Sequence, residues 1–342
     1  MKKRVVGLDI LRILSMLLIT VIHYIGYSDI ISLVNIQSSP ANYAFLVAMK
    51  SYSRAAVNIF VLITGYFMYT KEFKIKRILK LWCEVEFYSL VIMIFALIFV
   101  DGSLKLTNLV KSLFPLLSLH YWFVVTYVLL CLVSPGLNII INKISRKIHL
   151  AIIIIGGILI TIYMQANPFA ESQIYIGHSH SIVWFSYLYI LGAYISMYGS
   201  NLRKRYWALV GFVAWICLCM IVIFEKKIPS QIELLDNNTV FSLILSVSIF
   251  ILFKDIKIKS DKIVSIISEI SACSFGVYLI QEHQAIRKFF WNCINVQAYA
   301  NSPLMFINFF IAIICLWPIS IVIHKLFAFL YHHITTKSSG SR

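Results

Sequence analysis

The sequence predicts an all-α integral membrane protein, with about ten transmembrane helices in one bundle and both termini in the cytoplasm. Hydrophobic residues make up 60% of the 342 residues and charged residues 13%, which is far from the composition of a soluble globular protein. Apolar runs long enough to span a membrane recur along the chain. Lys and Arg gather in alternate connections between those runs, as the positive-inside rule requires.

The apolar segments are expected at about 8–27, 43–69, 80–100, 120–141, 149–165, 181–199, 206–224, 238–253, 264–283 and 303–330. A missed or extra segment would scramble the alternation of basic connections, so the charge pattern supports this count. We expect residues 1–335 to form a single transmembrane domain and residues 336–342 to form a short polar C-terminal tail.

The formal net charge of +16 does not indicate nucleic acid as a partner, because Lys and Arg lie in short clusters between apolar runs. The seven cysteines fall mostly inside apolar runs, and neither they nor the histidines have the spacing of a zinc site. We therefore expect membrane lipid as a partner, no nucleic acid and no metal.

The first apolar segment carries three groups that lipid disfavours: Asp9, Arg12 and His23. Arg12 and His23 are eleven residues apart, so both side chains should project from one helix face, about 16 Å apart along the axis. Asp9 and Arg12 have the spacing of an ion pair, which either orients the helix at the interface or serves a site. His23 suits general acid–base chemistry, whereas a core histidine bonded to one hydroxyl is the plainer alternative. Glu282 and His283 belong either to the mouth of a site or to a solvated helix end.

Further polar groups mark the second and third segments. Lys50, Arg54 and Asn58 are spaced four residues apart, which places three donors along one flank of a helix, where an anionic or sugar-bearing substrate is expected. For Lys50, snorkelling to lipid headgroups is the simpler account. Lys74 and Arg77 belong to a basic cluster at the inner start of the third segment. That cluster suits anionic lipid and the phosphates of a nucleotide cofactor equally well.

Together these segments resemble the acyltransferase-3 family of integral-membrane acyltransferases, in particular its single-domain members that modify bacterial envelope glycans. The family motif in the first helix is Arg or Lys, then ten residues, then His, and the stretch from Arg12 to His23 is similar to it. The family's R-x-x-R element in the third helix is Lys74 and Arg77 here, and Lys in the first place weakens bidentate recognition. The stretches SRAAVNIFVLITGYFMY, HYWFVVTYVLLCLVSPGLN and SACSFGVYLIQEH resemble further family segments, although relatives often have His where this chain has Gln281.

This resemblance implies transfer of an acyl group, often acetyl, to a sugar hydroxyl of an envelope or exopolysaccharide glycan outside a bacterial plasma membrane. Acetyl-CoA or another acyl-CoA is the implied co-substrate. Its phosphates would be held by Arg12, Lys74 and Arg77, with Asp9 orienting Arg12. Its thioester would reach His23, the expected general base.

Arg54, Asn58 and Trp122 are expected to shape an outer pocket in this hypothesis. The main alternative is a transporter or flippase of a lipid-linked glycan or small metabolite that uses the same buried charged residues. A structural or sensory membrane component is a weaker alternative. The enzyme hypothesis requires Arg12 and His23 to share one route through the membrane, so tightly packed apolar residues between them would favour a carrier.

Overall fold

The computed structural model describes residues 5–100, 106–116, 118, 121–163, 178–225 and 235–339, and these residues form helices with no strand among them. Among these residues, eight helical stretches are long and apolar enough to cross a membrane. Two shorter apolar helices fall on two further segments that were expected to span. The all-helical, multi-pass class is therefore confirmed, while the count of ten and the sides of the termini stay predictions. The basic residues 2–4 and the last residues of the expected tail, 340–342, lie outside the described residues.

The long helical stretches are α1 (Val6–Ser28), α3 with α4 (Pro40–Ser53 and Ala56–Met68), α5 (Ile75–Phe99), α7 (Trp122–Lys143), α8 with η1 (Arg146–Ile158 and Leu159–Tyr163), α11 (Lys204–Phe224), α13 (Asp261–Glu282) and α15 with α16 (Met305–Ile314 and Leu316–Ser339). The two shorter apolar helices are α10 (Ile182–Tyr198) and α12 (Val240–Lys254). The remaining short helices are α2 (Ile30–Leu33), α6 (Leu106–Leu113), α14 (Gln284–Ile294) and η4 (Val296–Tyr299).

Four of these helices are capped at their start by the side chain of a hydroxyl residue. The side chains of Ser145, Ser181, Thr239 and Ser260 each accept a hydrogen bond from the backbone N–H three residues later, at the starts of α8, α10, α12 and α13. Such N-caps satisfy one of the backbone donors that a helix leaves unpaired at its start. The same caps fix the two connections that precede α10 and α12.

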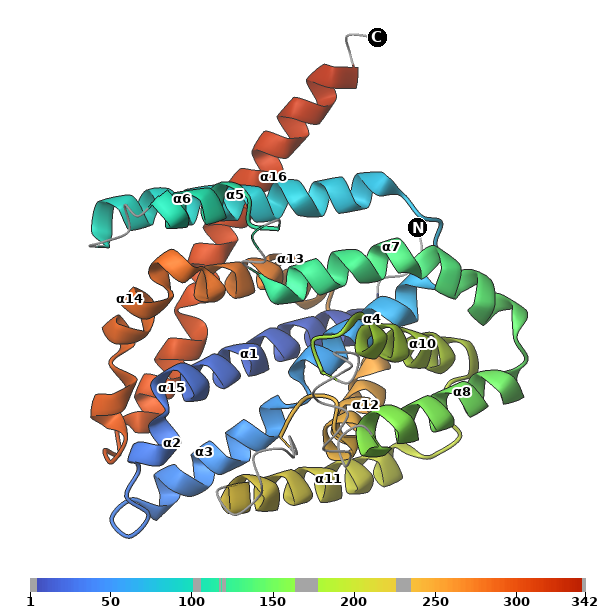
Figure 1. The fold of residues 1–342 in the computed structure, drawn as a ribbon, viewed down its shortest axis with the longest axis horizontal. Helices are drawn as coiled ribbons and strands as arrows, with labels where there is room; N and C mark the ends of the chain where they lie inside the picture. The colour runs from blue at the N-terminus through green and yellow to red at the C-terminus, as the bar shows by residue number, and fades with distance from the viewer. Residues whose placement is uncertain are drawn as a thin grey trace.

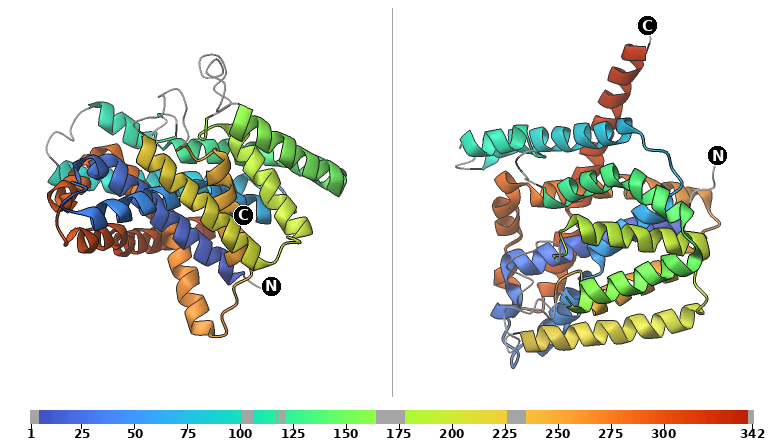
Figure 2. Two further views of the ribbon diagram at one scale, coloured as in Figure 1. Left: turned by 90° about the horizontal axis from the view of Figure 1, so that it is seen from below. Right: turned by 45° about the vertical axis from the view of Figure 1, so that its right-hand side comes forward.

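The first helix, α1, crosses the middle of the bundle and packs against α3, α4, α12, α13 and α15 (Figure 1). It runs parallel to α13, because Asp9 contacts Ser271 near one end of the pair and His23 contacts Glu282 at the other. By contrast, the C-terminal part of α16 projects away from the bundle (Figure 1 and the right-hand view of Figure 2). The parallel pairing with α13 gives a polar partner to each polar end of α1.

The backbones of α4 and α10 pack closely against each other. A Cβ atom added to Gly65 would lie 2.1 Å from the carbonyl oxygen of Tyr189, and one added to Gly192 would lie 2.4 Å from that of Leu62. Small residues at a helix interface let membrane helices approach to this distance. The contact fixes α4, which carries Asn58.

The second apolar segment is divided into two helices, and the three donors that were expected along one flank have different surroundings. Helix α3 ends at Ser53 and α4 begins at Ala56. Arg54 and Ala55, which join the two helices, both keep right-handed helical dihedral angles. Lys50 Nζ lies 2.6 Å from Glu225 Oε2, while Asn58 is fully buried inside the bundle.

Candidate functional site

His23 lies near the end of α1 that is predicted to face outward, and it contacts Glu282 at the end of α13. The distance from His23 Nε2 to Glu282 Oε1 is 3.1 Å, and Glu282 is only 6% exposed. Tyr27 donates its hydroxyl to the same carboxylate oxygen, and its ring stacks on His23 with the centroids 5.1 Å apart. Arg287 Nη1 lies 3.9 Å from the other carboxylate oxygen. Glu282 therefore fixes the imidazole through one ring nitrogen.

The second ring nitrogen of His23, Nδ1, is not used in the contact with Glu282. Nδ1 is buried and forms no hydrogen bond of standard geometry with the described residues, although the Gln281 side chain lies close enough to interact with the imidazole. His283 does not join this group. Its Nε2 lies 3.3 Å from the Ser89 hydroxyl and 3.5 Å from the Ser112 hydroxyl, at the junction of α5, α6 and α13.

His23 lines a cavity of about 400 Å³, called the outer cavity here, which is a size typical of small-molecule sites. Its walls come from α1, the break between α3 and α4, the start of α7, the connections before α10 and α12, and α13. The lining residues that matter for chemistry are His23, Arg54, Trp122, His180, Asp236 and Tyr278. The structure thus brings three of the expected site residues, His23, Arg54 and Trp122, to one cavity.

The wall formed by the two connections is rigidly held. Asp236 accepts backbone N–H bonds from Asn237 at 2.7 Å and from Ser179 at 3.3 Å, which ties the two connections together. Trp122 packs on His180 with the ring centroids 3.9 Å apart. Burial lowers the pKa of the His180 imidazole from its usual value, and the charge of Asp236 opposes that shift. His180 is therefore mainly neutral at pH 7.

Asn58 supports the outer cavity without lining it. Its Nδ2 donates to the carbonyl oxygen of Asn237 at 2.6 Å and to the Ser246 hydroxyl at 3.2 Å. Its Oδ1 accepts from the Trp184 indole at 3.0 Å. These bonds join α4 to the connection that carries Asp236, so Asn58 positions that wall of the cavity.

Asp9 and Arg12 lie at the opposite end of α1, and they form the ion pair that their spacing predicts. Arg12 Nη1 lies 2.8 Å from Asp9 Oδ1. Asp9 also accepts hydrogen bonds from the Ser268 and Ser271 hydroxyls of α13. The Arg12 guanidinium lies 5.7 Å from the centroid of the Phe67 ring, so cation–π attraction adds to its positioning.

Lys74 and Arg77 line a second cavity of about 230 Å³, called the inner cavity here. Lys71 and Tyr127 also line it, whereas Arg12 does not. Arg12 nevertheless lies nearby, because it and Lys71 contact the same Phe67 ring. The expected cofactor-binding residues are thus gathered at one end of the bundle, two of them in the cavity and one beside it.

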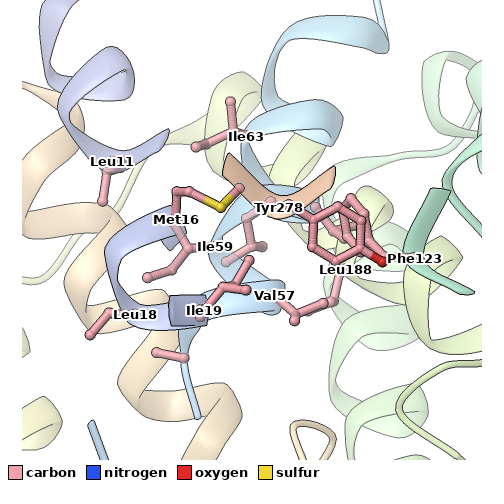
Figure 3. Close-up of a cluster of buried hydrophobic side chains, with 14 of the residues drawn as sticks. Leu11, Met16, Leu18, Ile19, Val57, Ile59, Ile63, Phe123, Leu188 and Tyr278 are labelled. Carbon is pink, nitrogen blue, oxygen red and sulfur yellow. The ribbon is translucent and has the colours of Figure 1, made fainter. Parts of the chain in front are cut away.

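A packed apolar layer separates the two cavities, which share no lining residue. Figure 3 shows Met16 and Ile19 of α1 beside Ile59 and Ile63 of α4, and all four are at most 6% exposed. On α7, Phe123 lines the outer cavity and Tyr127 the inner one, and their rings stack with centroids 5.9 Å apart. Within the part of the chain that the structure describes, the two cavities given by these residues do not join Arg12 to His23.

Three further aromatic and polar contacts complete the layer. Phe60 packs edge to face on Phe123 with centroids 5.6 Å apart, and the Thr64 hydroxyl lies 3.5 Å from that of Tyr127. Tyr278 of α13 packs on Phe123 at 5.7 Å. The helices α4 and α7 line both cavities, and each contributes side chains to the layer. Between the two cavities, α4 extends over about eleven residues, or about 16 Å.

Comparisons with known proteins give one match. A family model described as an acyltransferase domain matches residues 5–323, which is nearly the whole chain. The comparisons with curated proteins and with solved structures found no match.

Proposed function

This chain belongs to the acyltransferase-3 family of membrane acyltransferases, and we propose that it moves an acyl group from acyl-CoA to a sugar hydroxyl. In this proposal the acyl group is acetyl. The acceptor is an envelope or exopolysaccharide glycan, or its lipid-linked precursor, at the outer face of a bacterial plasma membrane. The observation that carries the proposal is the contact of His23 with Glu282 at the wall of the outer cavity.

The chemistry at this pair is general base catalysis. His23 donates Nε2–H to the Glu282 carboxylate, which leaves Nδ1 as the proton acceptor. The acceptor hydroxyl gives its proton to Nδ1 while its oxygen attacks the thioester carbonyl. The tetrahedral intermediate then expels the CoA thiolate, which takes the proton back from His23. The products are an ester on the sugar and free CoA thiol, and the carboxylate stabilises the imidazolium between the two proton transfers.

The inner cavity is the proposed entry for acyl-CoA. Lys74 and Arg77 are exposed cations at its wall, and Arg12 lies beside it, so three positive groups are available for the phosphates. An extended pantetheine arm has about the length that separates the two ends of the site. The arm reaches His23 only if the layer at Phe123 and Tyr127 opens, so the proposal includes a closed state without acyl-CoA and an open state with it.

The test of the base is a histidine replacement. His23→Ala should abolish acylation of the glycan, measured as the mass difference of surface glycans from cells with and without the variant. His332, exposed on α16, provides a control, because His332→Ala should leave acylation unchanged. Full acylation by His23→Ala, at an unchanged level of folded protein, refutes the role of His23.

The packed layer also favours a second candidate function. Two cavities closed from each other are what a transporter with alternating access requires, and His23 and Arg12 would then serve proton coupling or anion binding. Consumption of acyl-CoA separates the two functions. Purified protein that releases free CoA only when an acceptor is present supports the enzyme, and protein that never releases CoA supports the transporter.

A further inference from the structure

The outer cavity contains a cation that no described residue neutralises by contact. The Arg54 side chain forms no hydrogen bond and no ion pair with any part of the chain that the structure describes, and its Nε is buried. It sits at the junction of α3 and α4, and its side chain lines the cavity. His180, across the same cavity, is mainly neutral and does not compete for an anion.

The two carboxylates whose charges act on Arg54 are already occupied. Asp236 uses Oδ1 and Oδ2 to hold the backbone N–H groups of Asn237 and Ser179. Glu225 is paired with Lys50 through a contact of 2.6 Å. Both carboxylates therefore act on Arg54 through space, and neither supplies the bonded oxygens that a guanidinium in a partly buried site normally has.

A guanidinium presents parallel N–H donors that match the two oxygens of a carboxylate or phosphate. A ligand with such a group would satisfy donors that the protein leaves unbonded, and it would do so in the cavity that holds His23. We propose that Arg54 binds an anionic group of the acceptor, so that the preferred substrate is a sugar bearing a carboxylate or phosphate. This inference rests on the proposed function, because it assigns the acceptor to the outer cavity.

In this proposal the catalytic base and the anion-binding residue lie on two different walls of the outer cavity. His23 and Glu282 stand on α1 and α13, while Arg54 stands at the break between α3 and α4. Asn58, one turn into α4, anchors that helix to the connection carrying Asp236, so the wall beside Arg54 is held in place. An acceptor fixed by its anionic group at Arg54 would present a limited set of hydroxyls to His23.

The experiment measures binding of free sugars to purified protein, without acyl-CoA, by the fluorescence of its tryptophans or by its thermal stabilisation. The probes are glucuronate, glucose 6-phosphate and methyl glucoside, which differ in the anionic group. For wild-type protein, one of the two anionic sugars should bind at least about tenfold more tightly than methyl glucoside. Comparison of glucuronate with glucose 6-phosphate identifies whether the carboxylate or the phosphate is preferred.

The variants locate that preference. Arg54→Gln should weaken binding of the anionic sugar about tenfold or more and leave methyl glucoside within about twofold. Arg54→Lys keeps the charge but loses the parallel donors, so its affinity should be intermediate. Lys147→Gln is the matched control, because Lys147 is an exposed cation on α8 that lines neither cavity; it should behave as wild type.

Three results would overturn the inference: equal loss of neutral and anionic sugars in Arg54→Gln, no preference of wild type for an anion, or no binding of either anionic sugar. Unchanged binding of methyl glucoside shows that Arg54→Gln is folded. Because no acyl-CoA is present, this outcome is separate from the proposed transfer. If the protein binds anionic sugars through Arg54 but never releases CoA, the proposed acyl transfer is refuted and the anion-binding role of Arg54 is supported.

Discussion

The contact between His23 and Glu282 can be tested by removing one charge and little else. Glu282→Gln keeps the size and shape of the side chain, but it replaces the carboxylate by a neutral amide. In the structure that carboxylate lies 3.1 Å from His23 Nε2 and also accepts the Tyr27 hydroxyl. At 6% exposure, water does not replace the lost charge. The variant therefore isolates the electrostatic support of the imidazole.

The size of the effect follows from the state in which His23 carries the proton. A hydrogen bond to a charged group contributes about 1.5–3 kcal/mol. That contribution is largest for the imidazolium, which forms only as the acceptor hydroxyl loses its proton. At tenfold per 1.4 kcal/mol, Glu282→Gln should lower kcat by about 10- to 150-fold. KM for acyl-CoA should not change, because Glu282 does not line the inner cavity.

The assay is release of CoA thiol by purified protein in detergent, with and without acceptor, for wild type, Glu282→Gln and Tyr27→Phe. Tyr27→Phe removes one donor from the carboxylate and leaves the contact with His23, so kcat should fall less than tenfold. A wild-type kcat in Glu282→Gln, together with an inactive His23→Ala, would refute the argument that Glu282 supports the base. A raised KM with an unchanged kcat would instead indicate that Glu282 contributes to substrate binding.

Two further predictions concern the other parts of the structure. The double replacement Lys74→Gln with Arg77→Gln should raise KM for acyl-CoA about tenfold or more and leave kcat near wild type, since it removes two cations from the inner cavity; steady-state kinetics with an unchanged KM would contradict the phosphate site. Gly65→Ala should destabilise the protein by about 1–3 kcal/mol, because the new methyl group meets the carbonyl oxygen of Tyr189; thermal unfolding at the wild-type temperature would contradict that close packing.

The sequence was sufficient for the parts of the molecule that depend on local spacing. Apolar length alone locates the helices, because a span in lipid must satisfy its own backbone groups. The ion pair of Asp9 with Arg12 follows from helix geometry over three residues, and the structure has it at 2.8 Å. His23 stands out because a titratable group inside an apolar run needs a reason to be there.

The parts that the sequence did not predict depend on distant contacts. Glu282 is 259 positions from His23, and its place at the end of the ninth apolar segment was also consistent with a solvated helix end. Its one signal is that a carboxylate at the outer end of a span needs a buried partner there. The sequence between α3 and α4 contains no Pro or Gly, so no residue there predicts that the helix is divided at Arg54. The layer between the cavities depends on how α1, α4 and α7 pack, which periodicity does not give.

A cell that stores energy as a proton gradient loses it through any continuous file of water molecules. The side chains of Met16, Ile19, Ile63 and Phe123, buried between the two cavities, offer the water molecules of such a file no polar partner. A protein built this way can hold basic groups at one face and an imidazole toward the other while keeping the bilayer electrically sealed. Because of this packed apolar layer, we expect the protein in its resting state to conduct no more ions than a lipid bilayer without protein.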